Sequence, residues 1–297
     1  MKTPVRSFLF VPGDSERKLA KASSVPADAL ILDLEDSVSA FNAQAARALT
    51  REYLDQHKPA SRSQQIWVRC KPIQDPAALA DIAAIVAGNP DGILVPKVRS
   101  GDDLLALDHY LSALEAQAGI EGGTVQVLPT LTETAQSILQ AHTFAAVTPR
   151  LVGFSWGPID LMAALGASTN RGPDGAFETL YAYARGVCLL AAGASEVSPI
   201  DTICADYRDH RALRDECVFA RQAGFTGKLA IHPDQVNVIN ELFSPTPAEI
   251  AHAQRVLSSF EDGARGVVGL DGKMLDMPHL RQAQTILRRA NSLAKQG

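Results

Sequence analysis

Two acidic residues, Glu133 and Asp160, stand where the sequence passes from an apolar run into a predicted helix. Asp160 follows a Gly157-Pro158 break, and proline suits the first helical turn because no N–H is needed there. Turns that follow strands carry the ligand and metal sites of α/β folds. Two carboxylates at two such turns would suit Mg²⁺, which takes one or two protein carboxylates together with waters and substrate. Both acids are also explained as helix N-terminal residues favoured by the helix dipole.

Further polar residues come directly after apolar runs along the chain. They are Asp33, Glu35, Asp36, Arg69, Lys97, Thr130, Ser155, Asp201 and His232. If the runs are strands of one barrel, their carboxyl ends meet at one face, which is the active face of such folds. We therefore expect these side chains to share a common mouth with Glu133 and Asp160.

The cationic residues of this set each have two readings. Arg69 carries a planar guanidinium that suits a carboxylate or an enolate oxygen, but it also fits a structural ion pair with Glu35. Lys97 is either a substrate ligand or a simple strand-end lysine. His232, which precedes a proline, fits a hydrogen-bonded turn better than a catalyst.

A basic group lies near the first predicted strand, and its members are Arg6, Arg17, Lys18 and Lys21. Such charges usually form a solvated face. Near an active mouth they would bind an anionic tail such as the phosphates of coenzyme A.

The elements that must position these residues alternate regularly. Apolar runs predict strands near residues 6–14, 28–36, 65–70, 92–98, 124–129, 150–154, 196–201 and 227–233, with helices between them. Continuous rather than alternating hydrophobicity indicates strands that are buried on both faces. Eight strands alternating with helices in about 230 residues predict an α/β fold, a (β/α)₈ TIM barrel. A doubly wound open sheet is the alternative, although no G-x-G-x-x-G and no P-loop follows a strand.

The last stretch of the chain does not continue this alternation. A helix is predicted from Pro245 to about Glu261, and Asp271-Gly272 between two apolar runs predicts a hairpin before a final helix. We expect residues 1–243 to form the catalytic barrel. Residues 244–297 would form a helix–hairpin–helix appendage that acts as a lid or an oligomerisation arm.

Composition narrows the class of protein. The 297 residues are 46% hydrophobic, which allows a sizeable core, and the net charge of −5 argues against a nucleic-acid partner. The cysteines lack metal-binding spacing and are expected as free thiols in a reducing compartment: Cys70, Cys188, Cys204 and Cys217. We find no signal segment and no membrane-spanning run, so we expect a soluble, cytoplasmic protein without a membrane partner.

Several short motifs follow one another in order along the chain. They are Arg6-Ser7-x-Leu9-x-Val11-Pro12-Gly13, Asp33-Leu34-Glu35-Asp36-Ser37-Val38, Val68-Arg69, Pro96-Lys97, Gly157-x-x-Asp160-Leu161, Gly227-Lys228-x-x-Ile231-His232-Pro233 and Asp271-Gly272-Lys273-Met274-Leu275-Asp276-x-Pro278-His279. Together, and in this order, they resemble the HpcH/HpaI aldolase and citrate lyase beta-subunit family. The resemblance covers nearly the whole chain.

The resemblance implies a Mg²⁺-dependent TIM barrel that cleaves or forms a carbon–carbon bond in a 3-hydroxy-3-carboxyacyl thioester. Citramalyl-, malyl- and citryl-CoA are substrates of this type, and acetyl-CoA and a 2-oxo acid are the products. The family's metal ligands map onto Glu133 and Asp160, and its substrate-binding arginine maps onto Arg69. In the acyl-CoA lyase branch a catalytic aspartate, here Asp276, comes from a neighbouring subunit of a homotrimer or hexamer.

For such chemistry we expect Glu35 and Asp36 to order metal-bound water. The helix start at Gly157, Pro158 and Ile159 would bind the substrate carboxylate through its backbone. The presence of a C-terminal hairpin favours a stand-alone acyl-CoA lyase.

Three alternatives stay open: a malyl-CoA-type thioesterase, an aldolase for free 2-oxo acids, and a citrate lyase beta subunit that uses an acyl-carrier-protein thioester within a complex. The chain departs from the family's pattern at Ser39–Ala43, at Cys70-Lys71-Pro72 and at Pro158-Ile159. These departures bear on the choice of substrate and of acyl carrier.

Overall fold

The computed structural model describes residues 4–260 and 266–294 of the chain. Eight parallel strands close into a barrel in chain order, and the last strand pairs with the first. The strands are β1 (Ser7–Pro12), β2 (Ala29–Asp33), β3 (Gln65–Arg69), β4 (Gly92–Val95), β5 (Gln126–Leu131), β6 (Gly153–Trp156), β7 (Ser198–Asp201) and β8 (Gly227–Ala230). The predicted TIM barrel is therefore confirmed, and the open-sheet alternative is wrong.

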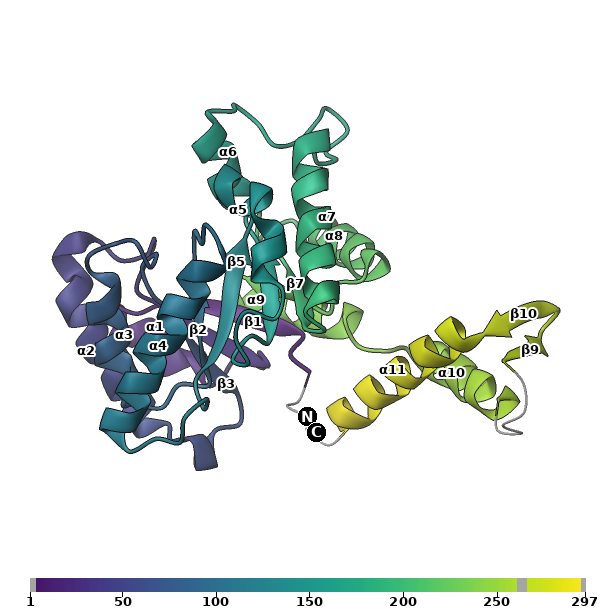
Figure 1. Ribbon diagram of the computed structural model, residues 1–297, viewed down its shortest axis with the longest axis horizontal. Coiled ribbons are helices and arrows are strands. Elements are labelled where there is room, and N and C mark those ends of the chain that lie inside the picture. The colour runs from purple at the N-terminus through teal and green to yellow at the C-terminus, as the bar shows by residue number, and fades with distance from the viewer. Residues whose placement is uncertain (1–3, 261–265, 295–297) are drawn as a thin grey trace.

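Helices surround this barrel (Figure 1). They are α1 (Glu16–Ala22), α2 (Ala43–Gln56), α3 (Ala78–Val86), α4 (Gly101–Ala118), α5 (Ala135–Leu139), α6 (Pro158–Leu165), α7 (Thr179–Ala194), α8 (His210–Ala223) and α9 (Pro233–Leu242), with short 3₁₀ turns at Ala40–Asn42, Pro59–Ser61 and Ala141–Phe144. The sequence predicts one helix over 133–144, but α5 begins only after Thr134. The Thr134 side chain accepts the Ser137 N–H at 3.1 Å and so caps the helix, which leaves Glu133 in the preceding loop.

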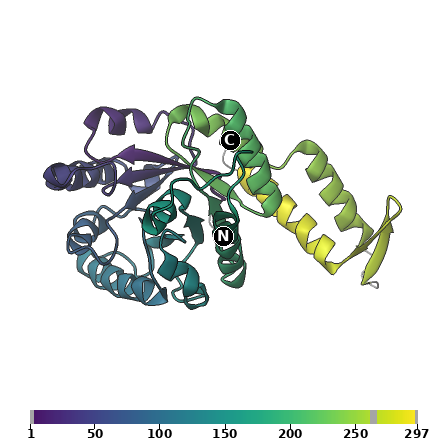
Figure 2. The same ribbon diagram turned by 90° about the horizontal axis from the view of Figure 1, so that it is seen from above.

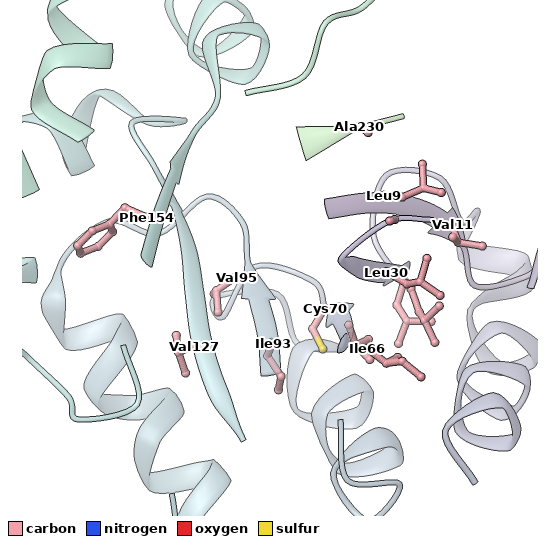
Figure 3. Close-up of a cluster of buried hydrophobic side chains, with 14 of the residues drawn as sticks. Leu9, Val11, Leu30, Ile66, Cys70, Ile93, Val95, Val127, Phe154 and Ala230 are labelled. Atoms are coloured by element: carbon pink, nitrogen blue, oxygen red, sulfur yellow. The ribbon is translucent and has the colours of Figure 1, made fainter. Parts of the chain in front are cut away.

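The core has two layers, because alternate residues of each strand point to opposite faces of the sheet. Leu30 and Leu32 of β2 pack outward beneath the helices, in the cluster that Figure 3 draws in part. Ala29 and Ile31 belong to a second cluster inside the barrel, together with Phe8. Both faces of the strands are thus apolar, which explains the continuous hydrophobic runs.

All four cysteines are buried free thiols, as expected: Cys70, Cys188, Cys204 and Cys217. Within the described ranges, every helix is too short or too polar to cross a membrane.

The appendage follows α9 and consists of α10 (Pro247–Ser259), β9 (Val267–Leu270), β10 (Lys273–Asp276) and α11 (Met277–Ala294). Its two helices and hairpin enclose a small apolar core of their own, which includes Val256 and Leu275. Asp271 and Gly272 adopt positive φ angles of 49° and 74° at the tight turn, so the predicted hairpin is confirmed. The predicted helix end at Glu261 lies outside the described residues. Both views show the appendage projecting from the barrel, with the hairpin at its far end (Figures 1 and 2).

Candidate active site at the mouth of the barrel

A cavity of about 440 Å³ opens at the carboxyl ends of the strands. Its lining includes these residues predicted from the sequence: Lys18, Asp36, Arg69, Glu133, Gly157, Pro158, Ile159 and Asp160. A neighbouring cavity of about 520 Å³ is lined by Lys97 and shares Glu133 and Asp160 with the first. The barrel thus brings residues from widely separated parts of the chain to one mouth.

Glu133 is held by an unusual backbone. Thr132 and Lys97 adopt φ angles of +67° and +53°, although neither residue is glycine. Such conformations cost about 1–3 kcal/mol each and cluster at functional sites. In these conformations the Lys97 backbone N–H donates a hydrogen bond to the Glu133 carboxylate. Glu133 is only 5% exposed. The strain therefore fixes one carboxylate oxygen of Glu133 and leaves the other for a ligand.

Gly157 provides the space that Glu133 occupies. A Cβ atom at position 157 would lie 2.4 Å from Cγ of Glu133 and 2.9 Å from its Oε1. The residue has an ordinary φ of −129°, so its lack of a side chain matters for space rather than for backbone conformation. Glu133 consequently packs against the turn that leads into α6, where Asp160 lies in the first helical turn.

The donor set fits Mg²⁺. Burial, and then the negative charge of Asp160, raise the pKa of Glu133 well above its usual range, and a bound cation would offset both effects. Within residues 4–260 and 266–294, no three His, Cys, Asp or Glu side chains gather in a metal-binding arrangement. Two carboxylates beside open space suit Mg²⁺, which keeps several waters, better than Zn²⁺, which takes three or four protein ligands.

Replacing Gly157 by Ala is expected to weaken Mg²⁺ binding by about tenfold or more, because the new methyl group must displace the Glu133 carboxylate. Isothermal titration of Mg²⁺ into the purified variant measures this loss. Gly193→Ala is the matched control, since a Cβ at that helical position meets nothing within 4 Å. An unchanged Mg²⁺ affinity in Gly157→Ala would show that Glu133 does not bind the ion from this position.

Arg69, the last residue of β3, is fixed by Asp33, the last residue of β2. Its Nε and Nη2 donate to the two carboxylate oxygens of Asp33 at 2.6 and 2.7 Å, and its Nη1 lies 3.0 Å from Glu35. Burial alone would raise the pKa of Asp33, but the hydrogen bond and charge of Arg69 outweigh it and keep that pKa below its usual value. The sequence suggested Glu35 as the ion-pair partner, whereas Asp33 makes the two-point contact.

Lys97 joins the acidic motif of β2 to the carboxylate pair. Its ammonium contacts Glu35, Asp36 Oδ1 at 3.3 Å and Asp160 Oδ1 at 3.4 Å. Burial raises the pKa of Glu35 to about 6, although the charges of Arg69 and Lys97 oppose the rise. Lys97 therefore lies among the carboxylates of the site and is not a solvated strand-end lysine.

Arg6 is not at the mouth, so its predicted role there is wrong. The residue precedes β1 and lies at the opposite end of the barrel, because strand order places it before the strand rather than after it. Its guanidinium forms two hydrogen bonds to Asp28, at 2.8 and 2.7 Å, and a third to Ser244 at 2.9 Å. Lys18 is the member of the basic group that lines the cavity.

Five other predicted residues do not line the two cavities at the mouth: Glu35, Ser155, Asp201, His232 and Asp276. Ser155 and Asp201 are buried, and Asp201 pairs with Lys228 at 2.8 Å. His232 caps α9 by accepting the Asp234 N–H at 3.3 Å, as expected for a turn histidine. Asp276 ends β10 in the appendage, and its Oδ1 lies 2.5 Å from Nδ1 of His279. The hairpin lies at the far end of the appendage, beyond α10 and α11 as seen from the barrel (Figure 1).

Family models match both parts of the chain. The HpcH/HpaI aldolase/citrate lyase model matches residues 6–233, and the model for the C–C bond lyase of the TIM-barrel fold matches residues 177–294. The citrate lyase subunit beta of Haemophilus influenzae is 33% identical over 290 residues, 97% of either chain. The (3S)-malyl-CoA thioesterase of Cereibacter sphaeroides is 36% identical over 294 residues, 98% of this chain and 96% of the relative.

A solved structure is also similar along the whole length. The crystal structure of CitE from Mycobacterium tuberculosis, in complex with magnesium, acetoacetate and coenzyme A, is 31% identical and superposes with a TM-score of 0.79. The match covers 98% of this chain and 100% of that one. The similarity therefore includes the barrel and the appendage.

Proposed function

Because this chain belongs to the HpcH/HpaI aldolase/citrate lyase family of TIM-barrel carbon–carbon lyases, we propose that it cleaves a 3-hydroxy-3-carboxyacyl-CoA thioester in a Mg²⁺-dependent reaction. Citramalyl-, malyl- and citryl-CoA are the candidate substrates, and acetyl-CoA and a 2-oxo acid are the products. One observation supports this proposal most strongly. The carboxylates of Glu133 and Asp160 and the guanidinium of Arg69 line the same cavity.

Glu133 and Asp160 would hold the Mg²⁺ ion, and magnesium is present in the solved CitE structure. When bound, the ion supplies Lewis-acid polarisation of the hydroxyl and carboxylate oxygens of the substrate. The N–H groups of Ile159 and Asp160, in the first turn of α6, are free to bind that carboxylate, because the first N–H groups of a helix have no partner within it. The helix start thus orients the acid end of the substrate.

Cleavage moves one proton and one electron pair. The substrate hydroxyl loses its proton to water ordered by Glu35 and Asp36, its oxygen forms the new carbonyl of the 2-oxo acid, and the carbon–carbon bond breaks. The electron pair of that bond passes to the thioester, which becomes an enolate. Arg69 donates hydrogen bonds to the thioester oxygen, where this negative charge develops.

Asp276 would complete the reaction by protonating the enolate carbon. Asp276 ends β10 in the hairpin and lines neither cavity at the mouth, which favours supply of this residue to the site of a neighbouring subunit. The same carboxylate would remove the proton in the condensation direction. A homotrimer or hexamer would then be the active form.

Replacing Arg69 by Lys is expected to lower kcat/KM by about a hundredfold. An ammonium lacks the planar fork with which Arg69 binds both oxygens of Asp33 while a further N–H group donates toward the thioester oxygen. Steady-state kinetics with the preferred thioester measure the effect. Arg47→Lys, which alters an Arg–Asp pair on α2 and α3, is the control and should retain activity. Equal activity of the two variants would remove Arg69 from the mechanism.

Product analysis tests the proposed function directly. Purified protein with Mg²⁺ is incubated separately with citramalyl-, malyl- and citryl-CoA, with and without a chelator. A lyase releases acetyl-CoA together with pyruvate, glyoxylate or oxaloacetate, respectively, and the chelator stops the release. The absence of any 2-oxo acid would overturn the proposal.

Thioester hydrolysis is the second candidate, because the matched Cereibacter sphaeroides protein is named a (3S)-malyl-CoA thioesterase. In that case the assay yields free CoA and no 2-oxo acid. If the protein turns over only an acyl-carrier-protein thioester, the result would instead favour a citrate lyase beta subunit. That is the name of the Haemophilus influenzae relative.

A further inference from the structure

A third cavity, of about 480 Å³, lies where the appendage meets the barrel. On the barrel side it is bordered by the carboxyl end of α8 and by Thr226, which directly precedes β8. On the appendage side it is bordered by Gln282 and Arg289 of α11. Since the residue before a barrel strand lies at the amino-terminal face, this cavity is at the opposite end of the barrel from the mouth.

The carboxylate in this cavity is paired with Arg221 and not with Arg289. Glu249 is the one carboxylate among the described residues that line it. Its Oε2 accepts hydrogen bonds from Arg221 at 2.6 Å and from the N–H and hydroxyl of Thr246 at 2.7 and 2.8 Å. Arg221 in turn donates to the Leu242 carbonyl at 3.1 Å. Glu249 is thus held by Arg221 and Thr246 through its Oε2, and no hydrogen bond or ion pair joins it to Arg289 among the described residues.

Arg289 has a buried N–H without an acceptor and forms no ion pair among the described residues, although the charge of Asp28 acts on it. Its Nη2 donates to the Thr226 carbonyl, but its Nε–H is buried and has no acceptor among the described residues. Burial, and then the positive charges of Arg221 and Arg6, lower the pKa of Arg289 to about 10. If Arg289 had only a structural role, its contact with the Thr226 carbonyl would satisfy Nη2 but leave the Nε–H without an acceptor. Buried polar groups are rarely left without a hydrogen-bond partner.

We propose that this cavity binds a small oxyanion, a carboxylate or a phosphate group, between Arg289 and Arg221. A guanidinium suits both groups, because its planar set of N–H donors matches their oxygens. Apolar side chains on the wall, among them Phe225, Phe243 and Ile286, leave room for a short carbon body on the anion. Because Arg221 belongs to the barrel and Arg289 to the appendage, the bound anion would fasten the two together.

Thermal unfolding tests this site. The protein, freed of divalent ions by EDTA, is titrated separately with sodium phosphate and sodium succinate, with sodium chloride at matched ionic strength as the reference. The active anion should raise Tm in a saturable way, by about 4 °C or more at a hundredfold excess over Kd. A response to phosphate alone would identify the ligand as a phosphate group, and a response to succinate alone would identify it as a carboxylate.

Variants locate the response within the molecule. Arg289→Gln should lose the anion-dependent rise in Tm, whereas Arg288→Gln should keep it, because Arg288 is exposed on the same helix and donates to Thr285. Gln282→Glu would place a carboxylate within the cavity. It should raise Tm in anion-free buffer and abolish the further rise, even if Arg289→Gln does not fold.

Two results would overturn the proposal. One is a wild-type Tm that responds no more to phosphate or succinate than to chloride. The other is an Arg289→Gln variant that retains the full response, which would assign the anion to another part of the molecule.

Discussion

Replacing Asp160 by Asn is expected to lower kcat by about a thousandfold or more, because it removes one of the two carboxylates that would hold Mg²⁺. The remaining ligand, Glu133, is buried, and burial disfavours its charged form, so a single carboxylate there would bind a divalent ion weakly. Chelator-sensitive turnover and calorimetric Mg²⁺ titration measure the two losses. Both should appear while the circular dichroism spectrum stays unchanged.

A matched control separates metal binding from helix stabilisation. Asp102 also lies in the first turn of a barrel helix, α4, but it is exposed and lines neither cavity at the mouth. Asp102→Asn should cost only about 0.3–1 kcal/mol of stability through the helix dipole and leave turnover intact. If Asp160→Asn has the same small effect, Asp160 is only a helix-terminal acid.

Replacing Asp276 by Asn is expected to lower turnover by about a thousandfold while Mg²⁺ and thioester binding persist. The substitution removes a general acid but no group that binds the metal ion or the substrate. Kinetics and calorimetry on the same preparation measure both properties. Asp271→Asn is the control, since Asp271 occupies the hairpin turn, where Asn is equally well accommodated. A fully active Asp276→Asn variant would exclude this residue from the chemistry.

Co-expression of Asp276→Asn with Asp160→Asn shows which subunit supplies the acid. If the appendage serves a neighbour, some sites combine an intact barrel with an intact hairpin, and random mixing restores about a quarter of the sites. If the appendage serves its own barrel, every chain carries one defect in its own site and mixing restores no activity.

Features that depend on local sequence could be predicted. The strands were predictable because each is buried on both faces, and the hairpin because Asp271-Gly272 fits a two-residue turn with positive φ. Glu133 and Asp160 could be paired because parallel strands bring their carboxyl ends to one face. A proline or an acidic residue after an apolar run marks the carboxyl end of a strand, and this mark can be read from a single sequence.

Features that depend on strand register and side-chain packing could not be predicted from the sequence. Asp33 is the partner of Arg69 because β2 and β3 pair these two residues side by side, and that register is not readable from either strand alone. The position of Arg6 is not predictable in this way, because nearness to a strand in sequence does not say which end of the barrel a side chain reaches. The need for glycine at position 157 appears only when the Glu133 side chain is in place.

The separate apolar core of the appendage has a consequence for how the molecule unfolds. Val256 and Leu275 belong to an apolar cluster that contains only appendage residues. We therefore expect the barrel and the appendage to unfold as two cooperative units. Calorimetry should then show a smaller transition that precedes the main one, and amide hydrogens of α10 and α11 should exchange with solvent before those of the barrel strands. Heating would unfold the arm that bears Asp276 first, and inactivation would occur below the melting temperature of the barrel.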